Sequence, residues 1–133
     1  MKKDISIPET HHISIAIVKE YNPAFKCDDW NAYLINNSDT TLETVLIVSK
    51  GFDDSQEKNT AVLRRKIAEL PGNSFAKIEM IQDEVLKLTN LFQVSFFIEN
   101  ILYDKSFKFE KGSVKESALR ILPKLNKRGV EIK

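Results

Sequence analysis

Apolar and polar residues alternate with a period of two along most of this chain, in runs that short polar clusters separate. The run at 13–18 is typical, because isoleucines occupy one side of the alternation at Ile13, Ile15 and Ile17. Successive side chains of a β-strand point to opposite faces, so this period, with β-branched residues, predicts a strand. Similar alternation recurs at 74–81, 91–99 and 101–110.

Residues 30–52 combine two apolar runs with a polar cluster between them. The cluster at 36–41, NNSDTT, is typical of a turn, and it predicts a β-hairpin or a wider arch. The return run at 43–49 is apolar on both sides in its middle. We therefore expect it to form a central strand, beside the strand that carries Trp30.

Residues 61–70 fit two structures. Leu63, Ile67 and Leu70 have helical spacing, and the residue types are good helix formers. Leu63, Arg65 and Ile67 also alternate with period two, and the neighbouring segments predict strands. The context favours a strand, in which the basic triplet Arg64-Arg65-Lys66 would alternate in direction.

Other segments predict loops and short helical turns. Residues 20–29 predict a loop, because Asn22-Pro23 is a turn signal. Residues 82–89 predict a helical turn that joins two sheets. Residues 113–122 predict one or two turns of helix with Ser113 as the N-cap. Alternation at the end of the chain predicts a final edge strand at 130–132.

This order of elements predicts the fold class. About seven short strands follow one another with no alternation of strand and helix, which is typical of an all-β, antiparallel β-sandwich. We expect an immunoglobulin-like layout with one or two short helical turns. The 133 residues suffice for one domain at 11–133, preceded by a flexible N-terminus at 1–10.

Composition restricts the environment. Apolar residues make up 42% and charged residues 29% of the chain, as in ordinary globular proteins. No run approaches the roughly 20 apolar residues of a membrane helix, and no secretory signal follows the first lysines. The single cysteine, Cys27, cannot form an internal disulfide, so we expect a cytoplasmic protein without a membrane partner.

Charge is distributed unevenly. Residues 105–133 carry a net charge of +6, and residues 1–104 a net charge of −5. The basic segment would fold back onto the acidic body, meet a second copy of it, or bind an anionic partner. The cations that would form such a patch are Lys105, Lys108, Lys111, Lys115, Arg120, Lys124, Lys127 and Arg128.

Aromatic residues suggest a second candidate surface. Five of the eight phenylalanines lie at 92–109, in an alternation that is more often core than a ligand platform. Tyr33, Tyr103 and Phe107 are nevertheless the candidates for an exposed interaction face.

Chemistry-bearing motifs are scarce. His11 and His12 would point to opposite faces of a strand, and Cys27 lies beside two aspartates that disfavour a thiolate. The glycines do not form a phosphate-binding loop. Paired carboxylates at 28–29, 53–54 and 83–84 lie in predicted loops. We therefore expect no enzyme, no metal site and no cofactor.

Longer stretches resemble known families. NPAFKCDDWNAYLIN, SFAKIEMIQDEVLKL and KRGVEIK are similar to a family of short bacterial proteins often labelled phenylalanyl-tRNA synthetase alpha subunit, over 11–133. That family has no established activity and implies no catalytic residues. Residues 33–51 more weakly resemble the β-sandwich domain that accompanies some Smr endonuclease domains.

The synthetase label can be tested against motifs. A class II synthetase needs an Arg-x-Glu motif for the α-phosphate and a glycine-rich strand and helix ending in arginine. Neither occurs in this chain. We expect no synthetase activity.

Two functional hypotheses remain. The first is a non-catalytic binding or scaffold module that uses a sheet face or edge to bind a protein partner or a second copy. The alternative is nucleic-acid binding, including tRNA, through the basic C-terminal segment. A small-molecule pocket between the sheets would leave no trace in the sequence.

Overall fold

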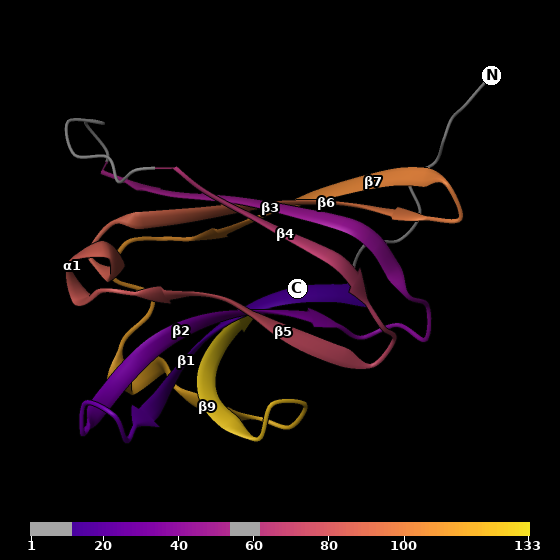
Figure 1. Ribbon diagram of the computed structural model, residues 1–133. Helices are drawn as coiled ribbons and strands as arrows, with labels where there is room; N and C mark the ends of the chain where they lie inside the picture. Colours follow the sequence, from indigo (N-terminus) through magenta and orange to yellow (C-terminus); the bar gives the residue numbers. More distant parts are fainter. Residues whose placement is uncertain (1–11, 54–61) are drawn as a thin grey trace.

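Two antiparallel sheets lie face to face in the computed structural model, which describes residues 12–53 and 62–133 (Figure 1). Sheet A has five strands in the order β5-β2-β1-β9-β8, and sheet B has four in the order β4-β3-β6-β7. The predicted all-β sandwich is confirmed. The N-terminus predicted to be flexible, 1–10, lies outside the described residues. The strands are β1 (Ile13–Asn22), β2 (Cys27–Asn36), β3 (Leu42–Phe52), β4 (Leu63–Leu70), β5 (Ser74–Ile81), β6 (Thr89–Ile98), β7 (Ile101–Phe109), β8 (Arg120–Leu122) and β9 (Lys127–Ile132).

The first seven strands give the immunoglobulin-like layout. In a constant-type immunoglobulin domain the first, second, fifth and fourth strands share one sheet, and the third, sixth and seventh form the other. Here β1, β2 and β5 lie together in sheet A, while β3, β6 and β7 lie in sheet B. The fourth strand, β4, has joined sheet B. The C-terminal pair β8 and β9 extends sheet A beyond β1.

The first hairpin is longer than the sequence predicts. β1 and β2 pair continuously from Ile13 opposite Asn36 to Asn22 opposite Cys27. The loop predicted at 20–29 is therefore wrong except at its turn, where Lys26 adopts a positive φ of 54°. Charged side chains at both strand ends obscure the alternation, while backbone pairing extends the ladder regardless.

The connection from β2 to β3 is an arch between the sheets. β2 lies in sheet A and β3 in sheet B, so of the two predicted alternatives the arch is confirmed and the hairpin is wrong, as is the predicted pairing of β3 with the strand of Trp30. Asn36 fixes the arch, because its Nδ2 donates to the carbonyls of Thr40 at 2.8 Å and Leu70 at 3.1 Å. The central position of β3 is confirmed, between β4 and β6.

The remaining connections agree in part with the sequence-based predictions. Residues 63–70 form a strand, and the helical turn α1 (Asp83–Leu86) joins the two sheets as predicted. Residues 113–122 contain only the 3-10 turn Glu116–Ala118 before β8, and the Ser113 hydroxyl donates to the Glu110 carbonyl instead of capping a helix. Residues 130–132 lie in a strand, β9, as predicted, but the prediction that this strand is at the edge is wrong. β9 lies between β1 and β8, and β8 forms the edge. No helix within the described residues is long and apolar enough to cross a membrane.

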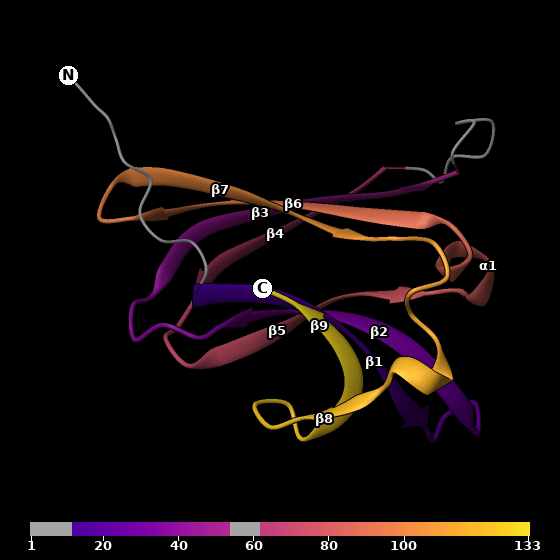
Figure 2. The same cartoon turned by 180° about the vertical axis from the view of Figure 1, so that it is seen from behind.

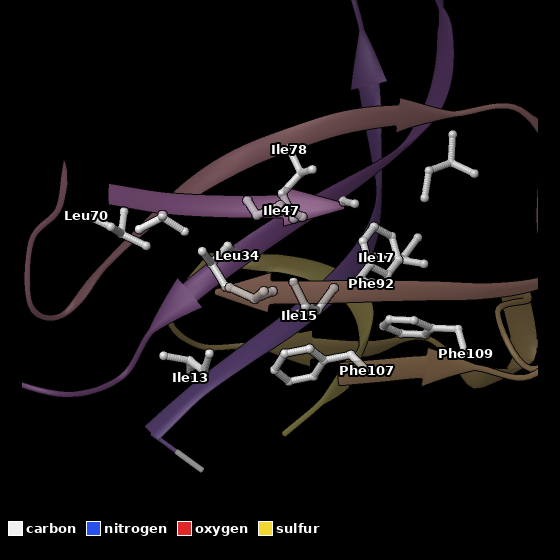
Figure 3. Close-up of a cluster of buried hydrophobic side chains, with 14 of the residues drawn as sticks. Ile13, Ile15, Ile17, Leu34, Ile47, Leu70, Ile78, Phe92, Phe107 and Phe109 are labelled. Carbon is white, nitrogen blue, oxygen red and sulfur yellow. The ribbon is translucent and has the colours of Figure 1, made fainter. Parts of the chain in front are cut away.

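The core lies between the sheets. The inward residues of β1, β2 and β5 meet phenylalanines of β6 and β7, as Figure 3 shows for Ile15, Phe92 and Phe107. Phe92 contacts Phe109 edge to face at 5.8 Å between ring centroids, a favourable aromatic arrangement. The prediction that the phenylalanine alternation forms core is confirmed. The core therefore holds most of the large apolar side chains and leaves the outer faces of the sheets to be considered separately.

Candidate interaction surfaces

The outer face of sheet A is covered over β1 and β2 by the chain's own C-terminal hairpin, while Phe75 and Met80 of β5 stay exposed. β8, β9 and their connecting turn curl beneath the other strands of sheet A (Figure 2). Leu122 and Leu125 from this hairpin pack with outward side chains of β1 and β2 in a second apolar cluster, whose other members are Ala16, Val18, Tyr33 and Ile35. At the far side of the sheet, Lys124 Nζ donates to Asn73 Oδ1 at 3.1 Å. The part of this face over β1 and β2 is not available to a partner while the hairpin is docked.

A polar network lies beside this second cluster. The Glu20 carboxylate accepts hydrogen bonds from Asn31 Nδ2 at 2.7 Å and from the Tyr33 hydroxyl at 2.7 Å, and Lys127 Nζ lies 2.9 Å away. Partial burial opposes ionisation of Glu20, but the three hydrogen bonds outweigh it and lower its pKa. Burial and the adjacent carboxylate raise the pKa of Tyr33. The network ties β9 to the first hairpin.

Replacing Glu20 with glutamine should destabilise the protein at neutral pH, because the charged acceptor holds three donors. The folded-state pKa of Glu20 lies below its unfolded value, so its stabilisation is present above the unfolded pKa and is lost as pH falls through the folded pKa. The difference between wild type and Glu20→Gln in urea midpoint should therefore be clear at neutral pH and shrink as pH falls through the folded-state pKa of Glu20.

Glu110→Gln provides the control for this effect. Glu110 makes an exposed ion pair with Lys108 at 3.5 Å, and such surface pairs contribute roughly 0–1 kcal/mol. We expect a smaller shift in the urea midpoint for Glu110→Gln at neutral pH. Equal shifts for the two variants would show that the Glu20 network adds nothing beyond an ordinary surface pair.

The eight cations of the predicted patch are divided between the two sheets. Lys105 and Lys108 lie on β7 in sheet B and alternate in direction. Arg120, Lys127 and Arg128 lie on β8 and β9 in sheet A. Lys111, Lys115 and Lys124 lie in the exposed connections beyond β7 and β8. The structure does not gather these side chains on one sheet face.

Part of the basic segment pairs with acidic groups of the same chain. Lys127 contacts Glu20, as described above, and Glu116 accepts from Lys19 and lies 3.4 Å from Arg128 Nη2. Lys19 lowers the pKa of Glu116 through this hydrogen bond. These contacts agree with the expectation that the tail folds back onto the body.

The predicted aromatic face is not exposed. Tyr33 is 8% exposed because the C-terminal hairpin covers it, and Phe107 is 1% exposed because it points between the sheets. Tyr103 is half-buried and stacks on Phe96 with ring centroids 5.5 Å apart. The expectation of an exposed face at these residues is wrong, because two of them point into the sandwich and a distant segment covers the third.

The outer face of sheet B is left uncovered by the residues that the structure describes. Buried Ile47 and Val94 point inward, so the alternate residues of the same strands point outward. No described segment crosses this side of sheet B in either view (Figures 1 and 2). We call this surface the outer face of sheet B. Three cross-strand rows make up its centre: Lys66, Leu46, Ser95 and Asp104; Arg64, Val48, Gln93 and Ser106; Lys50, Leu91 and Lys108.

These rows place cations around an apolar middle. Arg64 and Lys66 lie on the edge strand β4 and Lys108 on the edge strand β7, while the carboxylate in the rows is that of Asp104. Leu46 is 42% exposed at the centre. In the adjoining row Phe97 pairs with Leu102 and with Glu43, and Glu43 pairs with Glu69, so this end of the face is apolar and acidic. The three central rows are basic at their edges and apolar in their middle.

A small pocket opens at the seam between the sheets, beside α1. It has a volume of about 190 Å³ and lies between β3 and β4 on one side and the end of β5 on the other. The Glu79 carboxylate lies in it and accepts a hydrogen bond from the Ser49 hydroxyl at 2.6 Å. Burial raises the pKa of Glu79, and the Ser49 hydrogen bond opposes this shift.

Sequence reasoning missed Glu79. Strict alternation at 74–81 places Ile78 and Met80 inward and Glu79 outward. The pairing of β2 with β5 shifts register, so that Ala32 pairs with Glu79 but Tyr33 pairs with Lys77. This bulge turns Glu79 towards Ser49 and leaves Met80 51% exposed.

Two of the three predicted carboxylate pairs come together, and the pair at 53–54 lies partly outside the described residues. Asp28, Asp29, Asp83 and Glu84 line a pocket of about 280 Å³ beside Trp30. In the part of the chain that the structure describes, no three His, Cys, Asp or Glu residues are placed to hold a metal ion.

Comparisons with protein-family models, with curated proteins and with solved structures gave no match.

Proposed function

We propose that this chain is a non-catalytic binding module whose outer face of sheet B receives an acidic protein partner. The observation that carries the proposal is the contrast between the two sheets. The outer face of sheet A is covered over its central strands β1 and β2 by β8 and β9, whereas the centre of sheet B exposes apolar side chains among cations. Exposed apolar area rimmed by polar groups is typical of a protein-binding surface.

Charge favours a partner other than a second copy. A two-fold dimer through this face would bring the cations of β4 and β7 against those of the partner, and like charges oppose association. An acidic surface with an apolar centre would complement both parts of the face. The exposed, unpaired Cys27 supports a reducing compartment, so we place the module in the cytoplasm.

Nucleic-acid binding through the C-terminal segment receives less support. Lys127 and Arg128 make ion pairs within the chain, and Lys105 points inward on β7 at 5.1 Å from the Phe107 ring centroid. A polyanion would instead have to use the cations of the outer face of sheet B. Such binding would weaken steeply with added salt.

The test reverses charge on one face only. Arg64→Glu combined with Lys66→Glu should weaken binding of a purified acidic protein partner by about tenfold or more, since each lost charge pair at an interface costs free energy. Lys77→Glu combined with Lys115→Glu removes two exposed cations elsewhere and should leave affinity unchanged. Titration calorimetry of folded variants provides the measurement.

Three outcomes would contradict the proposal. Equal weakening by both double variants would indicate a general charge effect. Binding of single-stranded nucleic acid alone, abolished by Arg64→Glu and Lys66→Glu, would replace the protein partner with a polyanion. A concentration-dependent dimer that these substitutions disrupt would identify a second copy as the occupant.

A further inference from the structure

We propose that the seam pocket around Glu79 binds an alkylguanidinium or alkylammonium group. This site shares Lys50 with the outer face of sheet B but is centred on Glu79 at the seam between the sheets, so it does not depend on the proposed function. Three features carry the inference: a carboxylate without an ion pair among the described residues, a cavity of side-chain size, and apolar walls at its mouth.

The carboxylate is the first feature. Glu79 makes no ion pair with any described residue, and its hydrogen-bond partner among them is Ser49, which contacts Oε2. Two cations lie near the pocket but have other partners: Arg65 Nη1 donates to the carbonyl of the neighbouring Ile78 at 3.1 Å, and Lys50, which lines the pocket, lies over the Phe52 ring at 5.7 Å. Burying a carboxylate is unfavourable unless it is paired, so a bound cation would stabilise its charged form.

The volume of the pocket limits the ligand. Pockets for drug-sized ligands usually exceed about 300 Å³. The seam pocket has about 190 Å³, close to the volume that roughly six water molecules occupy in the liquid. This volume suits the outer part of an arginine or lysine side chain and excludes a nucleotide or another large molecule.

The walls suit an alkyl stem. Leu63, Met80 and Val85 line the pocket, and both Leu63 and Met80 are exposed at the surface. Long cationic side chains commonly place their methylenes along apolar surface while the charged head finds a polar partner. A guanidinium would donate to the Glu79 carboxylate, which can still accept the Ser49 hydroxyl because its two oxygens offer about four acceptor positions.

The experiment titrates the ¹⁵N-labelled full chain with three small probes: propylguanidinium, butylammonium and the neutral isostere propylurea. We expect saturable shifts of the Ser49, Gly51 and Val85 amide signals with both cations and none with propylurea. Glu79→Gln should weaken cation binding by about tenfold or more, as expected for loss of a charge-assisted hydrogen bond. Glu69→Gln removes an exposed carboxylate on β4 and should leave binding unchanged.

A second variant distinguishes a loss of the binding charge from misfolding. Glu79→Asp keeps the charge but retracts it by one methylene, so it should bind the cations more weakly than wild type and more tightly than Glu79→Gln. Absence of saturable shifts with the wild-type chain would overturn the proposal. Equal binding by Glu79→Gln, or equal shifts with propylurea, would overturn it as well.

A peptide arm distinguishes the source of the cation. Gly-Gly-Arg-Gly-Gly is compared with the same peptide carrying citrulline, which is neutral. Tighter binding of the arginine peptide than of propylguanidinium would identify a side chain of a partner protein. Binding of the small cations with exclusion of the peptide would identify a free amine or guanidine as the ligand.

Discussion

Replacing Phe107 with alanine is expected to lower the free energy of unfolding by about 3–5 kcal/mol. Phe107 lies on β7, points between the sheets and is 1% exposed, so the truncation removes buried apolar surface and leaves a cavity. The neighbouring Lys105 ammonium, 5.1 Å from the ring centroid, would also lose its contact with the ring. Because whole domains have stabilities of about 5–15 kcal/mol, the urea midpoint should fall markedly.

Leu102→Ala is the matched control on the same strand. Leu102 is 57% exposed on the outer face of sheet B, and substitutions of this kind usually change stability by about 0.5 kcal/mol or less. A small effect of Phe107→Ala, or one equal to that of Leu102→Ala, would contradict the inward orientation of Phe107. It would restore the sequence-based expectation that Phe107 lies on an interaction face.

Alternation was sufficient to predict most of the strands and the class of fold, but not β8 or the paired ends of β1 and β2. Period two at 91–99 and 101–110 predicts β6 and β7, and their Glu99-Asn100 turn has the two positive φ values, 50° and 67°, that a tight hairpin requires. The pairing of distant strands was not predictable in the same way. The polar cluster at 36–41 fits both a hairpin and an arch, and the hydrogen bonds of Asn36 to residues about 35 positions away settle it.

Local irregularity explains the error at the seam pocket. A β-bulge adds one residue to one strand, and it reverses the facing of every residue beyond it. The sequence at 74–81 contains no glycine or proline that would mark the bulge. The sequence therefore predicts that Glu79 is exposed to solvent. Its actual position in the pocket depends on the register of β5 against β2.

The burial of Tyr33 could not be predicted from its own strand. Its strand predicts which face the ring occupies, but the residues that cover that face, Leu122 and Leu125, lie about 90 positions later. The charge asymmetry of the sequence did suggest that the C-terminal segment folds back. It could not specify that Lys127 would contact Glu20, because that contact depends on β9 pairing with β1.

The C-terminal hairpin supplies the second large effect, since Leu125→Ala is expected to destabilise its docking by about 2–5 kcal/mol. Leu125 is 5% exposed, lies in the turn between β8 and β9, and packs under the first hairpin. Amide hydrogen exchange should accelerate more in β8 and β9 than in β3 and β6, because the hairpin adds to the edge of a sheet that already has its own core.

Ile121→Ala tests whether this effect comes from docking or from the strand itself. Ile121 lies on β8 but is 66% exposed, so its truncation should change exchange rates little. Equal acceleration in both sheets of Leu125→Ala would contradict a separately opening hairpin. Selective acceleration would mean that opening exposes Tyr33 and Ile35, so the outer face of sheet A would become a second apolar surface while the outer face of sheet B stays unchanged.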